Sequence, residues 1–216
     1  MPIPPTAISF GPVVTATDVR NAVQSTIELW IGTYLALMSR HDGQDPTTPD
    51  GVLPSFLSYP DALDVSRFAE DQIPACILVV PGITDTPKKK GDGTISANFE
   101  VGIGCAVTGQ SRALTLKLAQ LYTAAVRLII LQNRSLGDFA TGVVWTREEY
   151  TSSVLRSDDL RTMAIGVLEF VVNVDNVADV SQGPLVPIPN NEMPTGWATI
   201  GSTDIILTGD VVGTEL

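Results

Sequence analysis

The chain has 216 residues, and 13 Lys and Arg against 24 Asp and Glu give it a formal net charge of −11. Phosphate backbones are bound by clustered positive charge, so this balance argues against a protein that binds nucleic acid over a broad surface. Charged residues are 17% and apolar residues 44% of the chain, and the mean hydropathy is positive. Ordinary soluble domains are roughly 25% charged. We therefore expect one core-forming domain that covers part of its apolar surface against other chains.

The start of the chain and its cysteines favour a soluble protein of a reducing compartment. Residues 1–14 contain four prolines and are expected to be an extended leader without the features of a signal peptide. No run approaches the ~18 uncharged apolar residues of a membrane helix. Cys76 and Cys105 lie in apolar stretches without metal-site spacing, which predicts buried free thiols. Such thiols fit a protein assembled in the cytoplasm.

The first helix is expected from Thr17, acting as N-cap with Asp18 in the first turn, to about Arg40. Its apolar residues recur at helical spacing and should form one core-facing stripe: Val19, Val23, Ile27, Trp30, Ile31, Tyr34 and Met38. Residues 41–74 contain five prolines and are expected to be irregular, with a short helical possibility over 62–71. A loop this long is often functional, and in an oligomer it could be a contact loop.

Two strands should follow, over residues 75–80 and 95–107. The first is a continuous apolar run, and the second alternates apolar with wetter positions at a period of two. They are expected to form a hairpin with a flexible basic tip that carries Lys88, Lys89 and Lys90. These lysines are candidate interaction residues. They could serve to solvate a loop, to contact an acidic partner chain or to contact passing DNA.

A second helix should begin after its cap, Ser111, and present a core stripe on one face: Leu114, Leu118, Leu121, Tyr122, Ala125 and Ile129. Residues 133–138 are expected to be its exit turn, with Gly137 in a left-handed conformation. Strands over 142–150 and 162–174 should form a second hairpin. The order predicts an α+β fold, with an antiparallel sheet of about four strands, two long helices packed on one face and an extended C-terminal arm.

The composition changes near the C-terminus. Residues 175–216 hold six Asp and Glu and no Lys or Arg, and prolines recur between 184 and 194. We therefore expect a domain over 1–180 and an acidic arm over 181–216. The arm contains a strand-like apolar stretch, Ile205, Ile206 and Leu207, which could add to its own sheet or to a neighbour's sheet. A frayed tail is the alternative.

Catalytic motifs are weak. Residues 104–111 follow a G-x-x-x-x-G-x-S frame, but Gln110 stands where a phosphate loop needs Lys, so an ordinary strand–turn–helix junction is expected. His41 is the only histidine, which leaves little for a catalytic triad or a zinc site. Glu148 and Glu149 are neighbours on a strand and should point to opposite faces, so they cannot act as a dyad. We expect no catalytic residue, metal or cofactor.

Several segments between Thr17 and Val174, taken in order, resemble the phage tail terminator (tail completion) family. A long N-terminal helix and a Pro-containing loop precede Ile73-Pro-Ala-Cys-Ile-Leu-Val-Val-Pro-Gly82, and a Lys-Gly-Asp-Gly turn leads into the alternating strand. The second helix carries Leu118-Ala-Gln-Leu-Tyr-Thr-Ala-Ala-Val-Arg127, and the last strands bracket Trp145-Thr-Arg-Glu-Glu-Tyr150.

This resemblance implies a structural virion protein without enzymatic activity, located at the head-proximal end of the tail. A homohexameric ring would cap the tail tube, stop its polymerisation and dock to the head-side connector protein. Viral DNA would pass through the lumen without specific binding, and the net negative charge would keep it from sticking if the acids face inward. Another head-to-tail connector or neck protein, a peptide-binding module and a nucleotide-binding enzyme remain as alternatives.

Overall fold

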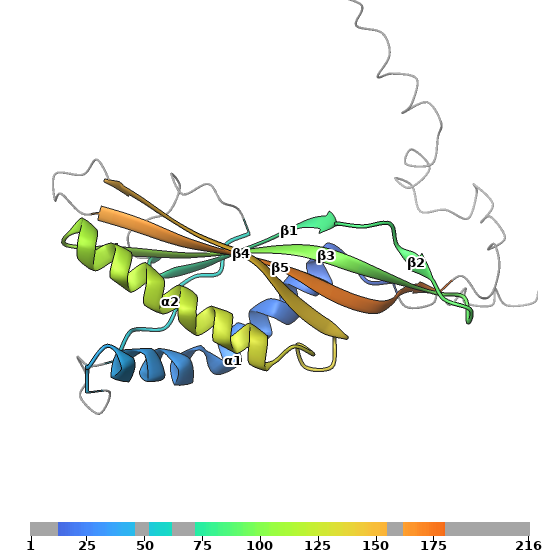
Figure 1. Cartoon of the computed structure of the whole chain (residues 1–216), viewed down its shortest axis with the longest axis horizontal. Coiled ribbons are helices and arrows are strands. Elements are labelled where there is room, and N and C mark those ends of the chain that lie inside the picture. The colour runs from blue at the N-terminus through green and yellow to red at the C-terminus, as the bar shows by residue number, and fades with distance from the viewer. Residues whose placement is uncertain (1–12, 46–51, 62–71, 155–161, 180–216) are drawn as a thin grey trace, which may run out of the picture. The chain divides into compact units, whose positions relative to one another are not determined.

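The computed structural model describes residues 13–45, 52–61, 72–154 and 162–179 (Figure 1). The elements in chain order are α1 (Ala16–His41), β1 (Ala75–Ile83), β2 (Lys88–Lys89), β3 (Thr94–Gly109), α2 (Arg112–Gln132), β4 (Gly142–Val154) and β5 (Thr162–Asp179). The strands form one antiparallel sheet in the order β1-β3-β5-β4, with β2 beside β3. The predicted α+β class and both hairpins are confirmed. The helical possibility over 62–71 and the C-terminal arm lie outside the described residues.

Both helices pack on the same face of the sheet (Figure 1). The helix α2 contacts β3, β4 and β5, whereas α1 contacts α2 and the edge strand β1. The core lies between these two layers, and its largest fully buried side chains include Ile27, Leu35, Leu78, Ile103, Ile129 and Phe170. The opposite face of the sheet carries no helix among the described residues.

The N-cap of α1 is Thr15, and the predicted cap at Thr17 is wrong. The Thr15 side chain accepts a hydrogen bond from the Asp18 backbone N–H at 3.3 Å, and the Asp18 carboxylate accepts one from the Thr15 N–H at 2.8 Å. This reciprocal capping box needs a hydroxyl three residues before an acid. Only Thr15 has that spacing to Asp18, so Thr17 falls within the first turn.

The apolar stripes of the two helices were predicted with two errors. Trp30 is 39% exposed and Leu114 is 45% exposed. In α2 the helix approaches the strands closely at three small side chains, Thr115, Ala119 and Thr123, which are fully buried.

The ends of α2 agree with the sequence. The predicted left-handed conformation of Gly137 in the exit turn is confirmed by its φ of 72°. Ser111 caps α2 as expected, accepting from the Leu114 N–H at 3.3 Å.

The long strand β3 is only partly amphipathic. In its first half the core-facing Ala97, Phe99 and Val101 alternate with less buried positions, as the sequence predicts. In its second half the helix-free face is also buried, because Gly104 and Ala106 pack with Ile77 of β1 and Ile165 of β5. The small side chains on this half permit such packing on both faces.

The two edges of the sheet differ. Residues 57–60 lie along the outer edge of β1, where Cys76 N–H donates to Ser58 O at 3.0 Å and Leu78 N–H donates to Pro60 O at 2.9 Å. The opposite edge strand, β4, pairs only with β5 among the described residues. Its outer edge therefore has unpaired backbone groups within this part of the chain.

The helix α2 is long and apolar enough to cross a membrane, by length and composition alone. Eight of its residues are buried, and it packs on both the sheet and α1. Core helices of globular proteins meet the same two criteria, so the finding is weak evidence for a membrane span.

Candidate interaction surfaces

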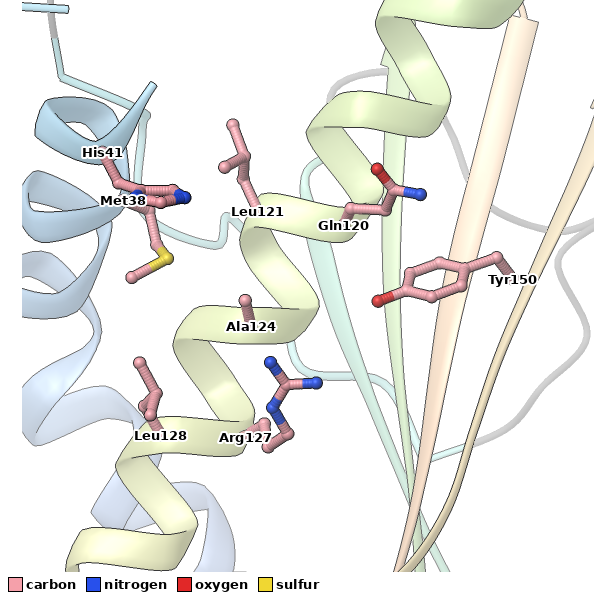
Figure 2. Close-up of a pocket in the computed structure, with 8 residues that line it drawn as sticks. All are labelled: Met38, His41, Gln120, Leu121, Ala124, Arg127, Leu128 and Tyr150. Carbon is pink, nitrogen blue, oxygen red and sulfur yellow. The ribbon is translucent and has the colours of Figure 1, made fainter. Parts of the chain in front are cut away.

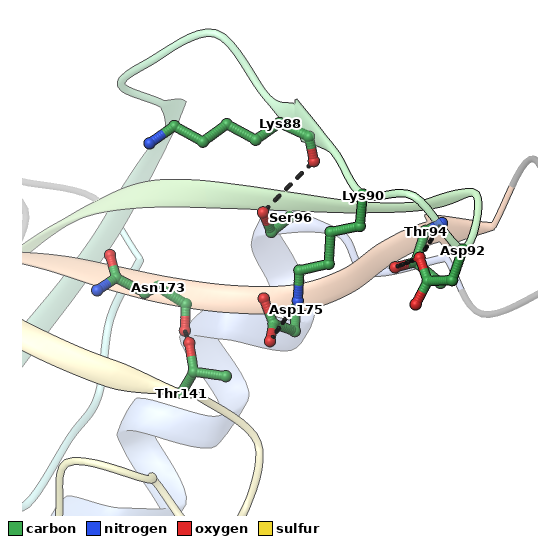
Figure 3. Close-up of polar contacts among 8 residues, drawn as sticks. All are labelled: Lys88, Lys90, Asp92, Thr94, Ser96, Thr141, Asn173 and Asp175. Atoms are coloured by element: carbon green, nitrogen blue, oxygen red, sulfur yellow. Dashed lines mark hydrogen bonds and ion pairs between the residues drawn. The ribbon is translucent and has the colours of Figure 1, made fainter.

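The basic tip between β1 and β3 contains a short strand, β2, that the sequence did not predict (Figure 3). Lys88 and Lys89 form the short strand β2 and pair with Ser96 and Ile95 of β3. The turn is closed by a hydrogen bond from the Lys90 N–H to Thr94 O at 2.8 Å. Backbone pairing could not be inferred from three adjacent lysines, because their side chains favour solvent in any conformation.

Two acids stabilise this hairpin. Asp92 accepts hydrogen bonds from the Thr94 N–H at 2.9 Å and its hydroxyl at 2.7 Å, and these bonds lower the pKa of the Asp92 carboxyl. Lys90 forms an ion pair with Asp175 of β5 at 2.7 Å (Figure 3). Of the three predicted interaction lysines, only Lys88 and Lys89 remain without an ion pair among the described residues. The other predicted contact residues, Ile205, Ile206 and Leu207, lie outside the described residues.

A mixed polar and apolar cluster covers the helix side of β4. Arg127 of α2 forms an ion pair with Glu148 at 2.6 Å and lies over the Trp145 ring at 5.0 Å from its centroid. The Tyr150 hydroxyl donates to the same Glu148 carboxylate, and burial raises the pKa of Tyr150. Arginine stacked on an aromatic ring and paired with a carboxylate is held in one orientation. The cluster therefore fixes the shape of this edge of the sheet.

The other side of β4 carries a second charge group. Arg147 forms ion pairs with Glu149 and, at 3.6 Å, with Glu169 of β5. Glu148 and Glu149 thus point to opposite faces, as expected for neighbours on a strand. They cannot act together on one substrate.

Large exposed apolar side chains gather on two elements. The first set, which we call the α1 patch, consists of Leu29, Trp30 and Leu37, exposed by 73%, 39% and 45%. The second, the β4 patch, consists of Trp145 and Tyr150 on the helix side of β4, whereas the exposed Val144 points to the other face. Beside the α1 patch, a groove of about 480 Å³ runs between α1 and the turn after α2. The sequence signal for the α1 patch was the absence of any charged residue between Glu28 and Arg40, but periodicity alone assigned Trp30 to the core.

A hollow of about 460 Å³ lies between the C-terminal half of α1, the middle of α2 and β4 (Figure 2). Met38 and His41 of α1 line one side, Tyr150 of β4 lines the other, and α2 lies between them. No group of three or more metal-ligating side chains occurs within the described residues. His41 thus lacks the partners of a metal site in this part of the chain.

The segment that imitates a phosphate loop is part of the sheet and a helix cap. Gly104 lies inside β3, where a Cβ would lie 3.4 Å from the Cβ of Ile77. Ser111 is the N-cap of α2 and Gln110 is exposed at the junction. A phosphate loop needs a loop between strand and helix whose N–H groups surround the anion. Here residues 104–109 of the segment belong to the strand β3, so no such loop is formed.

Comparison of the chain with protein-family models and with curated proteins gives no match. Among solved structures, a chain described as "Virion of native gene transfer agent (GTA) particle" is similar at a TM-score of 0.36 and 15% sequence identity. The match covers 55% of this chain and 78% of that chain. A likeness at this level establishes neither a shared fold nor a shared function.

Proposed function

We propose that this protein is a structural component of a phage-like virion and acts as a tail terminator. In this proposal, copies of the chain form a homohexameric ring that caps the tail tube, stops its polymerisation and joins the tail to the head-side connector. The observation that carries it is the exposure of the α1 patch and the β4 patch on a chain with few charges. Large apolar side chains grouped on the surface are typical of a protein that contacts other chains.

The position of the two patches suits a ring. One patch lies on α1, which contacts the β1 edge of the sheet, and the other lies on β4, at the opposite edge. A ring forms when one surface of a subunit binds a different surface of the next and the rotation closes. Two separate apolar surfaces at opposite edges of the sheet meet this requirement.

The helix-free face of the sheet offers acids to a lumen. Glu100, Glu149 and Glu169 alternate along their strands with residues that face the helices, so they lie on the helix-free side. Arg147 lies on the same face and pairs with Glu149 and Glu169, so these four residues carry an excess of negative charge. If this face lines the channel, that excess keeps DNA mobile as it passes. Lys88 and Lys89 are then left for contacts with an acidic surface of the tube or the connector.

The decisive experiment measures the mass of the full chain by analytical ultracentrifugation, alone and with purified tail tubes. We expect a ring of about six copies, or a monomer that assembles only on tube ends. A monomer that stays monomeric in the presence of tubes would contradict the proposal.

The open edge of β4 favours a second candidate, a module that binds an extended peptide by strand addition. That function predicts a monomer whose binding of peptides is lost when β4 is blocked. The same ultracentrifugation separates the two candidates, because a peptide-binding monomer does not change mass on tail tubes.

A further inference from the structure

The two cysteines of the chain lie side by side on neighbouring strands, on the same face of the sheet. Cys76 of β1 and Cys105 of β3 are direct partners in the antiparallel register. Both belong to the core on the helix side, and both are 0% exposed. The sequence predicted that both thiols are buried, each on its own strand, but it did not predict which residues of the two strands pair.

The hydrogen-bond pattern shows which kind of cross-strand pair they form. The Cys76 N–H donates to Ser58 O on the outer side of β1, so it points away from β3. Leu78, two residues later, does the same with Pro60. Cys76 and Cys105 are therefore a non-hydrogen-bonded pair, the kind with Cα atoms about 4.5 Å apart and side chains closest together. That separation lies within the roughly 4.4–6.8 Å that a disulfide spans.

The surroundings keep both thiols protonated. Burial raises the pKa of Cys105 to about 12 and also raises the pKa of Cys76. The thiolate is the reacting species, so reaction requires a local opening. Within the sheet β1 pairs with β3, and its outer edge is covered by residues 57–60. An opening that releases β1 and this segment exposes the thiols without unfolding the rest of the sheet.

We propose that Cys76 and Cys105 are a modification site, a dithiol that closes into an intramolecular disulfide between β1 and β3 when the protein meets a small-molecule disulfide. The Sγ–Sγ bond forms, and each cysteine gives up one proton and one electron. The small disulfide accepts both electrons and both protons, and its S–S bond breaks to give two thiols. This modification does not depend on the proposed tail role.

The test is an equilibrium between the full chain and mixtures of glutathione and glutathione disulfide, in native buffer and in concentrated urea. Samples that start reduced and samples that start oxidised must reach the same end point, since burial makes exchange slow. After acid quench and alkylation, mass spectrometry gives the ratio of disulfide to dithiol, and the disulfide form is lighter by about 2 Da.

We expect this ratio to be at least about tenfold higher in the folded chain than in urea at the same glutathione composition. By the thermodynamic cycle, a tenfold gain means that the disulfide stabilises the fold by about 1.4 kcal/mol. A ratio in the folded chain equal to or below the ratio in urea would overturn the proposal, because the native geometry would then not favour the bond.

Two variants serve as controls. Cys76→Ser leaves one thiol, and only mixed disulfides with glutathione are expected from it. The double variant Cys76→Ala/Ile77→Cys moves the thiol by one residue to the opposite face of β1. The loop that its disulfide closes is one residue shorter, so its ratio of disulfide to dithiol in urea should match that of the wild type. In native buffer its ratio should not rise above the ratio in urea. The comparison of wild-type chain in buffer and in urea decides the question even if this variant does not fold.

Discussion

Single residues decide where α1 begins. The hydrogen bonds between Thr15 and Asp18 satisfy three donors at the start of the helix, the backbone N–H of each residue and the Thr15 hydroxyl. Thr17 is exposed, lies two residues after the cap and has Arg20, not an acid, three residues later. Two threonines that look alike in the sequence therefore differ in their effect on stability.

Replacing Thr15 by Ala should lower the free energy of unfolding by about 1 kcal/mol, because the cap of α1 is lost. Urea unfolding followed by circular dichroism measures the change. Thr17→Ala is the matched control and should change the free energy of unfolding by less than about 0.5 kcal/mol. An equal effect of both variants would show that Thr15 is not the cap.

The same pair has a pH signature with a defined sign. The hydrogen bonds from Thr15 lower the pKa of Asp18 below its ordinary value of 3.8 in the folded chain. A carboxyl whose pKa is lower in the folded chain stabilises the fold at any pH above its pKa in the unfolded chain. This stabilisation is lost as the pH falls through its pKa in the folded chain. The difference between wild type and Thr15→Ala should therefore shrink on acidification below about pH 4.

At the scale of elements, the close approach of α2 to the sheet depends on Gly166 of β5. A Cβ at this position would lie 2.0 Å from the Thr123 hydroxyl and 3.0 Å from a ring carbon of Tyr150. Thr123 is fully buried, and its hydroxyl donates to Ala119 O at 2.7 Å. Neither neighbour can move freely, so the helix and the sheet are complementary only while residue 166 has no side chain.

Gly166→Ala should lower the free energy of unfolding by about 1–3 kcal/mol through overpacking. Gly102→Ala is the control, because a Cβ there would meet only Val79 O at 3.9 Å, and its effect should stay within about 0.5 kcal/mol. Adding Thr123→Ala to Gly166→Ala should recover part of the loss. If the double variant were as unstable as the sum of the two single variants, the clash with Thr123 would not be the cause.

At the scale of the whole molecule, the exposed apolar residues are the feature that the fold of one copy leaves unexplained. Leu29, Trp30 and Leu37 contribute little to the core, and Glu28 is the last charged residue before them on α1. Interfaces concentrate their binding energy in a few such side chains. The α1 patch should therefore affect assembly much more than folding.

Leu29→Glu should weaken self-association at least about tenfold while leaving the thermal unfolding midpoint of the subunit unchanged. Analytical ultracentrifugation over a concentration series measures the first effect and circular dichroism the second. Asn21→Glu adds the same charge to the same helix two turns earlier and should leave assembly intact. Unchanged assembly of Leu29→Glu would remove α1 from the interface and leave the β4 patch as the contact.

The sequence by itself determined the two helices, the four long strands, their order and the α+β class, but not the short strand β2. Hydrophobic period is a local property of the chain, so Val19, Val23 and Ile27 indicated a helix and Phe99, Val101 and Ile103 a strand before any packing was known. It could not predict that Trp30 and Leu114 are exposed, because the width of a buried stripe depends on what packs against it.

Only the tertiary structure decided the long-range pairings. The register that sets Cys76 opposite Cys105, the ion pair of Lys90 with Asp175 and the position of Thr123 over Gly166 all join residues far apart in the sequence. A shift of one residue in a strand would move every side chain to the other face. Such contacts depend on the free energy of the whole packed sheet rather than on any local pattern.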